Sequence, residues 1–161
     1  MANDWKIHGA HRPLPALLAA AKELAIAELH RRLGEEGHPQ IRPGHGCVFR
    51  FIDVEGTRLT AIAERSGFTK QAVGEVVDDL ERMDYVERVP DPEDRRAKII
   101  RLTERGWEAQ GAGQRIFADI ERGWAERFGE ERVATLREVL EEIVAEDAAS
   151  TAAERPPAVV A

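Results

Sequence analysis

The chain has 161 residues, of which 33% are charged and 43% hydrophobic, and its formal net charge is −7. This length favours a single domain with a core of its own. No apolar run reaches the length of a membrane-spanning helix, and the first residues lack the basic-then-apolar pattern of a secretory signal. With one cysteine, the chain can form neither an intrachain disulfide nor an all-cysteine metal site. We therefore expect a cytoplasmic protein.

The acidic charge is distributed unevenly. Residues 1–64 carry 8 basic and 8 acidic side chains, residues 65–105 carry 9 and 10, and residues 106–161 carry 6 and 12. The excess of acid therefore lies mainly in the last third of the chain. A nucleic-acid site, if the chain has one, must be local, because the surface as a whole is not basic.

The first third of the chain predicts a long helix, a loop and a short helix. Pro13 and Pro15 precede a stretch rich in alanine and leucine, which predicts a helix to about Leu33. The glycines and prolines of residues 34–44 are typical of a loop, and we expect a short helix within residues 45–53. Residues 57–59 are too few to interpret by themselves.

The middle third predicts two short helices and a β-hairpin. Thr60 is a candidate N-cap and Gly67 a candidate stop for the first helix, and Thr69 is a candidate N-cap for the second. Apolar residues recur at helical spacing along the second helix, which predicts one buried face: Val73, Val76, Val77, Leu80 and Met83. Residues 85–89 and 97–102 read as two strands that flank a charged loop.

The last third predicts two further helices. Thr103 is positioned to cap a long helix that ends near residue 128, and an amphipathic helix follows Gly129. Gly111 and Gly113 inside the long helix each cost about 1 kcal/mol relative to alanine, so we expect a bend or a close backbone approach there. Residues 150–161 are small, polar and proline-containing, and we expect them to be disordered. The fold class is mostly α with a small β-hairpin, an α+β arrangement.

The two short helices carry the spacing of a helix-turn-helix motif. Ala63 is small enough for two helices to cross closely, Gly67 suits a turn with positive φ, and Val73 would anchor the second helix in the shared core. Such a pair can present its second helix to the DNA major groove. The same spacing fits any tight corner between two helices, so this motif alone does not decide between the two interpretations.

The charged loop adds a second signal. Asp94, Arg95 and Arg96 are followed by alternating apolar residues and by Leu102-Thr103. In this combination the sequence resembles the MarR family of bacterial transcription regulators, closely from Leu59 to about Arg105 and in the order and length of the flanking helices. The resemblance implies a winged helix-turn-helix: a single domain over residues 1–149, with a DNA-binding lobe at 41–103 and dimerisation helices at 1–40 and 104–149.

The resemblance also implies how this lobe would contact DNA. A recognition helix, residues 69–83, would enter the major groove, and a wing, residues 90–97, would enter the minor groove. Arg96 would be the minor-groove residue, since a narrow minor groove concentrates negative potential, and Asp94 would brace its guanidinium. Pro90 and Pro92 would stiffen the loop. The predicted DNA contacts are Thr69, Lys70, Gln71, Gly74, Glu75, Arg95, Arg96 and Lys98.

Individual contacts on the helix follow from side-chain chemistry. Lys70 can reach phosphate or guanine, Gln71 can read adenine, and Glu75 can accept from a cytosine amino group. Asp78 and Asp79 fit poorly on a helix that approaches a polyanion. We expect these two acids to lie outside the contact or to lower non-specific affinity.

Further partners are implied by the resemblance: a second copy of the chain, a double-stranded operator and a small-molecule effector, with an anionic aromatic as one option. No cofactor is expected. The candidate ligand-pocket residues are His11, His45, Cys47, Arg50 and Trp107. Arg50 would suit a carboxylate or phenolate, although a surface or ion-paired arginine is the simpler interpretation. The candidate residues for the dimer interface or the core are Trp107, Ile116, Phe117, Ile120, Trp124, Phe128, Val133, Leu136, Leu140 and Ile143.

Other functions find less support in the sequence. The chain has no nucleophile elbow, phosphate-binding loop or zinc-protease motif, so we do not expect an enzyme. Cys47 lies in an apolar stretch that favours an inert thiol. The resemblance implies that a peroxide sensor of this family would carry its reactive cysteine near the N-terminus, and no cysteine precedes Cys47. His8 and His11 lack a third ligand, so no metal site is predicted. The alternatives are a winged helix that binds proteins without sequence-specific DNA binding, or a metal- or redox-responsive sensor of the same fold.

Overall fold

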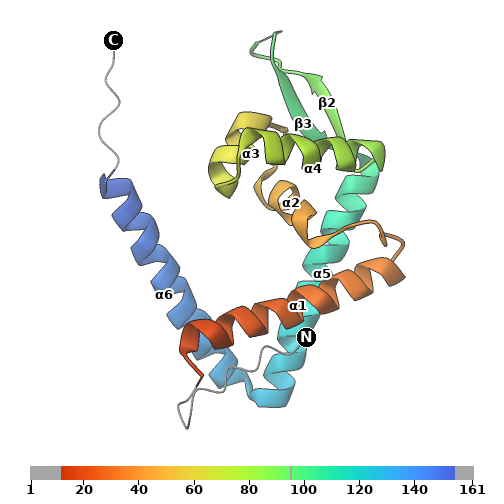
Figure 1. Cartoon of the computed structure of the whole chain (residues 1–161). Helices are drawn as coiled ribbons and strands as arrows, with labels where there is room; N and C mark the ends of the chain where they lie inside the picture. Colours follow the sequence, from red (N-terminus) through yellow and green to blue (C-terminus); the bar gives the residue numbers. More distant parts are fainter. Residues whose placement is uncertain (1–11, 95, 155–161) are drawn as a thin grey trace. The chain divides into compact units, whose positions relative to one another are not determined.

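The structure is a computed structural model that describes residues 12–94 and 96–154. The chain divides into two compact units between Phe117 and Ala118. The first unit holds the helices and strands of the predicted DNA-binding lobe, and the second holds the C-terminal helical part (Figure 1).

The first unit opens with α1 (Leu14–Glu35), which is followed by a short 3-10 helix, η1 (Pro43–His45), and by α2 (Gly46–Phe51). Pro13 stands at the N-cap of α1, as its fixed φ and missing N–H allow. The long helix, the loop and the short helix predicted for this third of the chain are therefore confirmed.

The next two helices, α3 (Leu59–Ser66) and α4 (Lys70–Arg82), confirm the predicted pair. Gly67 ends α3 with φ +72°, the left-handed conformation that glycine adopts at little cost. Thr69 caps α4, because its side chain accepts the backbone N–H of Ala72. The prediction that Thr60 caps α3 is wrong. The helix begins after Arg58, whose extended backbone belongs to a strand.

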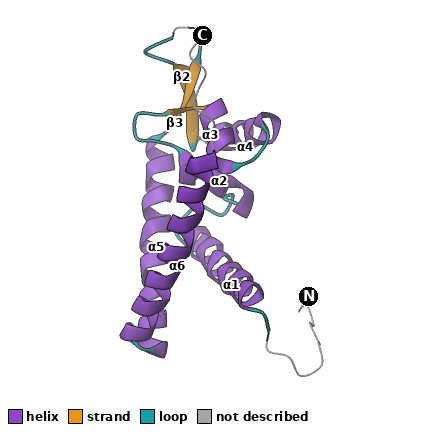
Figure 2. Ribbon diagram, turned by 90° about the vertical axis from the view of Figure 1, so that its left-hand side faces the viewer, coloured by secondary structure: helices purple, strands orange, loops and turns teal. Residues whose placement is uncertain are grey.

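That strand, β1 (Thr57–Arg58), joins β2 (Val86–Pro90) and β3 (Lys98–Leu102) in one antiparallel sheet of order β1-β3-β2. The hairpin is in register from Val86 opposite Leu102 to Pro90 opposite Lys98. Figure 1 shows this hairpin projecting beyond α3 and α4, and Figure 2 shows its two strands side by side. The hairpin was predicted, but β1 is too short to carry a periodic signal.

The core of this lobe lies between the helix pair and the sheet. Its fully buried side chains come from α3, α4, the strands and the residue before β2: Ile62, Val73, Val77, Leu80, Tyr85, Val86 and Ile100. The apolar spacing predicted for α4 thus faces this core, with Val76 and Met83 half-buried at its edges. The opposite face of α4 is left for solvent or a partner.

Tyr85 connects this lobe to the preceding loop and to the following helix. Its hydroxyl lies 3.2 Å from Nδ1 of His38 and accepts a hydrogen bond from the guanidinium of Arg105 at 3.3 Å. Arg105 also lies over the tyrosine ring, 4.8 Å from its centroid. Thr103 accepts the backbone N–H of Gly106, which confirms the predicted cap of the next helix.

The last helices are α5 (Glu104–Phe128) and α6 (Glu130–Glu154), separated by Gly129 with φ +101°. Because α6 is helical to Glu154, the prediction that disorder begins at residue 150 is wrong for residues 150–154, and residues 155–161 lie outside the described part. A β-carbon at Gly111 would meet the Arg115 side chain at 3.5 Å, and one at Gly113 would meet Leu29 at 3.9 Å, both ordinary contacts. In the described residues no helix is long and apolar enough to cross a membrane.

Candidate nucleic-acid interface

The first turns of α4 present an exposed polar face. Lys70, Gln71 and Glu75 are exposed, and Gly74 between them is half-buried with open space where a side chain would stand. The Gln71 amide nitrogen donates to the Glu75 carboxylate at 3.3 Å. The pair is therefore held together before any ligand arrives, with the Gln71 carbonyl oxygen left as an acceptor. The opposite face of α4 is anchored in the core, so the exposed face is held by a rigid support.

The two acids that fitted poorly on this helix are both paired with cations. Asp78 accepts from the Arg88 guanidinium at 2.5 Å, and the same guanidinium pairs with Glu81. Asp79 accepts from Nε2 of His45 at 3.0 Å and from Arg82 at 2.7 Å. The hydrogen bond from His45, helped by Arg82, lowers the pKa of the Asp79 carboxyl. These contacts satisfy the acids within the protein, away from the first turn of α4.

Arg88 belongs to β2, so its contacts also join the wing hairpin to the helix. Its side chain is half-buried, with 23% of its area exposed, and it bridges one strand of the hairpin to two turns of α4. A half-buried bidentate arginine holds its carboxylate partners in a defined geometry. The wing and the helix are therefore tied together as one body within this lobe.

The loop of the hairpin is organised by two aspartates. Asp91 is buried, with one carboxylate oxygen accepting the Glu93 N–H at 2.8 Å and the other accepting Nε of Arg58 at 2.6 Å. These two hydrogen bonds, the backbone one first, lower the pKa of Asp91. The base of the loop is thus fixed to β1, on the far side of β3.

Asp94 stabilises the turn at the tip of the loop. Its carboxylate accepts the backbone N–H of Arg96 at 3.0 Å, and its own carbonyl accepts the N–H of Ala97 at 2.8 Å. The brace predicted between Asp94 and the Arg96 guanidinium is therefore a brace to the Arg96 backbone. The Arg96 and Lys98 side chains are exposed, and Arg95 lies outside the described residues.

The structure describes four of the five predicted ligand-pocket residues. His45 is buried and bonded on both ring nitrogens, to Arg42 N–H and to Asp79. Cys47 donates to the Gly44 carbonyl, and burial raises the pKa of its thiol, as expected of an inert cysteine. Arg50 and Trp107 are exposed, and Arg50 lies over the Phe51 ring. His11 lies outside the described residues.

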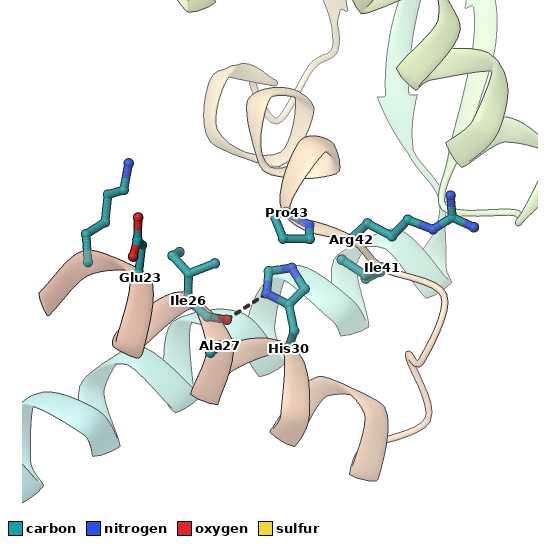
Figure 3. A pocket seen from close by; sticks show the side chains of 8 residues that line it. Glu23, Ile26, Ala27, His30, Ile41, Arg42 and Pro43 are labelled. Carbon is teal, nitrogen blue, oxygen red and sulfur yellow. Dashed lines mark hydrogen bonds between the residues drawn. The ribbon is translucent and has the colours of Figure 1, made fainter. Parts of the chain in front are cut away.

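A cavity of about 480 Å³ lies instead between α1 and the loop that leads into η1 (Figure 3). Its lining comes from Lys22, Glu23, Ile26, Ala27, His30, Ile41, Arg42 and Pro43. The His30 ring donates from Nδ1 to the Ile26 carbonyl at 2.7 Å, so its Nε2 is an acceptor when the ring is neutral. Figure 3 shows the α1 residues facing the loop residues across this space.

A metal site finds no support in the part of the chain that the structure describes, where no group of three or more histidine, cysteine, aspartate or glutamate side chains is placed to hold an ion. His8 and His11, at which no metal site was expected, lie outside that part.

Comparison with known proteins identifies the lobe. Residues 41–97 match the model of the MarR family. The segment 41–97 belongs to the MarR family. The described fold as a whole is that of solved MarR-family structures, although identities below 25% show the fold alone.

Three of these structures illustrate the likeness. The reduced form of MarR from E. coli aligns with a TM-score of 0.70 at 18% identity, covering 83% of this chain and 98% of that one. CouR from Rhodococcus jostii, bound to p-coumaroyl-CoA, gives 0.62 at 24% identity, covering 80% and 90%. A mutant of MepR from S. aureus, bound to an oligodeoxyribonucleotide, gives 0.58 at 20% identity, covering 84% and 99%. No curated protein matches the chain.

Several residues that position the MarR-family lobe were not found from the sequence. Arg58 and Asp91 are 33 residues apart, and His45 and Asp79 are 34 apart, so no local periodicity links them. The only indication in the sequence was that Asp78 and Asp79 fit poorly on a helix that approaches DNA. Their charge is nevertheless a sign that donors from elsewhere in the fold meet them, Arg88 of β2 for Asp78 and His45 of η1 for Asp79.

Proposed function

We propose that the protein is a dimeric, ligand-responsive transcriptional regulator of the MarR family, a cytoplasmic repressor that binds a pseudo-palindromic DNA operator. The observation that carries the proposal is the exposed face of Lys70 and Gln71 on α4, tied through Arg88 to the same hairpin that exposes Arg96. A helix face and a wing fixed to each other can contact the major and the adjacent minor groove together. The oligodeoxyribonucleotide bound to the MepR mutant supports this reading.

The proposed DNA contacts follow from exposure and chemistry. Lys70 and Lys98 would contact phosphates, and Arg96 would enter the minor groove with its backbone held by Asp94. Gln71 and Glu75 act as a pair, because the bond between them leaves an acceptor on each for a base amino group. We therefore expect the operator to present an adenine or cytosine amino group at this point. Thr69 and Gly74 would let the first turn of α4 approach closely.

The proposed dimer rests on apolar side chains that remain exposed in a single chain. Leu14, Leu17 and Leu24 recur at helical spacing along one face of α1 and are 61%, 46% and 72% exposed. In the second unit, the exposed apolar residues are Trp124, Phe128, Leu136, Val139, Ile143 and Val144. Such faces cost free energy in water unless another surface covers them. A second copy would also set two recognition helices about 34 Å apart, one turn of DNA.

The cavity between α1 and the η1 loop is the proposed effector site. Its floor is apolar, from Ile26, Ile41 and Pro43, while Lys22 and Arg42 supply positive charge against the single acid Glu23. An apolar pocket with cationic side chains among its lining suits a small aromatic or aliphatic anion. The p-coumaroyl-CoA bound to CouR supports a small-molecule effector for a protein of this fold.

The wing provides the test of the proposed function. Operator sequences would first be selected from random duplex DNA and their affinity measured by mobility shift. We expect Arg96→Ala to weaken operator binding by about tenfold or more, in line with ~1–3 kcal/mol for a specific arginine contact. Arg101→Ala is the matched control, since Arg101 is also exposed on the hairpin but lies on β3 outside the wing loop.

Circular dichroism and sedimentation would establish that both variants keep their fold and oligomeric state. Equal affinities of Arg96→Ala and the parent chain would contradict the wing assignment. A chain that selects no sequence from the random pool would favour the protein-binding alternative instead.

A further inference from the structure

His45 lies where the cavity loop meets the recognition helix. It is the last residue of η1 and is 4% exposed. Its Nδ1 accepts the backbone N–H of Arg42 at 3.1 Å, so that nitrogen carries no proton. The proton therefore sits on Nε2, which donates to the Asp79 carboxylate of α4 at 3.0 Å. One buried ring thus joins the backbone of the loop to the side of the helix.

The loop end of this connection is also a wall of the cavity. Ile41, Arg42 and Pro43 line the cavity opposite α1, and it is the Arg42 N–H that His45 holds. Ile41 is buried and its own N–H donates to the His38 carbonyl, which ties the loop to the residues before it. A displacement of the Arg42 backbone would therefore act directly on the hydrogen bond that Nδ1 of His45 accepts.

Asp79, which receives the hydrogen bond from His45, lies on the same helix as the proposed DNA contacts. Asp79 and Gln71 lie on the same continuous helix, so they are separated by roughly 12 Å of regular backbone at 1.5 Å per residue. The helix is capped at its start by Thr69 and has no proline within it. A displacement at Asp79 is accordingly carried to the first turn as a movement of the whole helix.

We propose that His45 is a positioning residue that couples occupancy of the cavity to the placement of α4 on DNA. The inference rests on the proposed function, of which it names the regulatory link. A ligand that pushes the Ile41–Pro43 wall would alter the Arg42–His45–Asp79 chain of hydrogen bonds and thereby shift Lys70 and Gln71. Occupancy of the cavity and binding of the operator would then be linked by a coupling free energy, which a double-mutant cycle measures directly.

Two amide substitutions distinguish the two hydrogen bonds of the ring, because each retains only one of them. In His45→Gln, the side-chain amide reaches the position of Nε2 and can still donate to Asp79. In His45→Asn, the shorter amide reproduces the Nδ1 acceptor for Arg42 but falls short of Asp79. We expect operator affinity to stay within about threefold of the parent in the glutamine variant and to fall about tenfold in the asparagine variant, a loss within the range of measured couplings. Asp79→Asn, which weakens the same bond from the other side, should resemble His45→Asn.

The coupling is tested with a substitution that places a larger side chain in the cavity. Ala27 is exposed on the cavity face of α1, so Ala27→Trp places an indole in the cavity without burying a new residue in the core. We expect Ala27→Trp to change the affinity for the selected operator about tenfold in the parent chain and less than about twofold in the His45→Asn background. Melting temperature and affinity for random DNA serve as readouts that should stay unchanged across the cycle.

An additive cycle, or an Ala27→Trp variant that binds the operator as the parent does, would overturn the inference and leave the proposed function standing. Failure of the parent chain to select any operator would overturn the proposed function and this inference with it. Loss of operator affinity that tracks a loss of melting temperature in His45→Asn would show that His45 is merely structural.

Discussion

Two acids of the proposed DNA-binding lobe are paired with residues that are distant in the sequence. Asp91 holds Arg58 and Asp79 holds His45, in each case across more than thirty residues of sequence. Both carboxylates have their pKa lowered by these donors, Asp91 first by the Glu93 backbone N–H. An acid that is paired in this way costs little near DNA, because its charge is already balanced inside the protein.

The lowered pKa of Asp91 predicts a dependence of stability on pH. Because the pKa is lower in the folded state than in the unfolded state, the ionised carboxylate stabilises the fold above its ordinary range, and this contribution is lost as the pH falls through the folded value. We expect the free energy of unfolding of the parent to fall more steeply below about pH 4 than that of Asp91→Asn. Urea unfolding at a series of pH values measures the difference. Parallel curves for the two proteins would argue against a stabilising role for the Asp91–Arg58 pair.

At the scale of elements, α5 packs most tightly against the lobe at Gly106 among the glycines of this helix. A β-carbon at Gly106 would lie 2.1 Å from the Tyr85 carbonyl oxygen, which explains why this turn of the helix needs glycine. Gly111, further along the same helix, has room for a side chain. Two glycines that look alike in the sequence therefore have opposite roles.

These two glycines make a matched pair of substitutions. Gly111→Ala should raise the free energy of unfolding by about 1 kcal/mol, since alanine loses less entropy in a helix. Gly106→Ala should lower it by ~1–3 kcal/mol, because backbone atoms of Tyr85 or of α5 must move to relieve the contact. Chemical denaturation of both variants measures the two effects. Destabilisation by Gly111→Ala would imply that a surface absent from the single chain packs closely on that face of α5.

At the scale of the whole molecule, the exposed leucines of α1 predict an obligatory partner. Leu24→Glu places a charge on the proposed dimer face, where burial of an unpaired carboxylate is costly. We expect this variant to sediment as a monomer and to lose at least about tenfold in operator affinity, because one lobe alone contacts half a site. Val54→Glu is the control, since Val54 is 70% exposed in the loop between α2 and β1.

If Leu24→Glu sediments as a dimer, Leu24 lies outside the interface. The apolar face of the second unit would then be the better candidate. Dissociation of the Val54→Glu control would show that the method reports a general effect of added charge.

Much of the architecture can be predicted from signals within short segments of the sequence. The caps Thr69 and Thr103, the left-handed turn at Gly67 and the apolar spacing of α4 are signals carried within a few residues, and each is found as predicted. The hairpin and the family of residues 41–97 follow from similarly local patterns. Backbone hydrogen bonding and side-chain periodicity act over one or two turns, so these features need no knowledge of the rest of the fold.

What the tertiary structure decided is which distant residues meet. It placed His45 between the cavity loop and α4, and it brought Arg58 of β1 to Asp91 of the hairpin loop. It also made a strand of Thr57–Arg58, which displaced the start of α3 from Thr60. The physical reason is the same in each case. A polar side chain in a folded chain takes the partner that packing brings within 3 Å, and the sequence separation of that partner is set by topology alone.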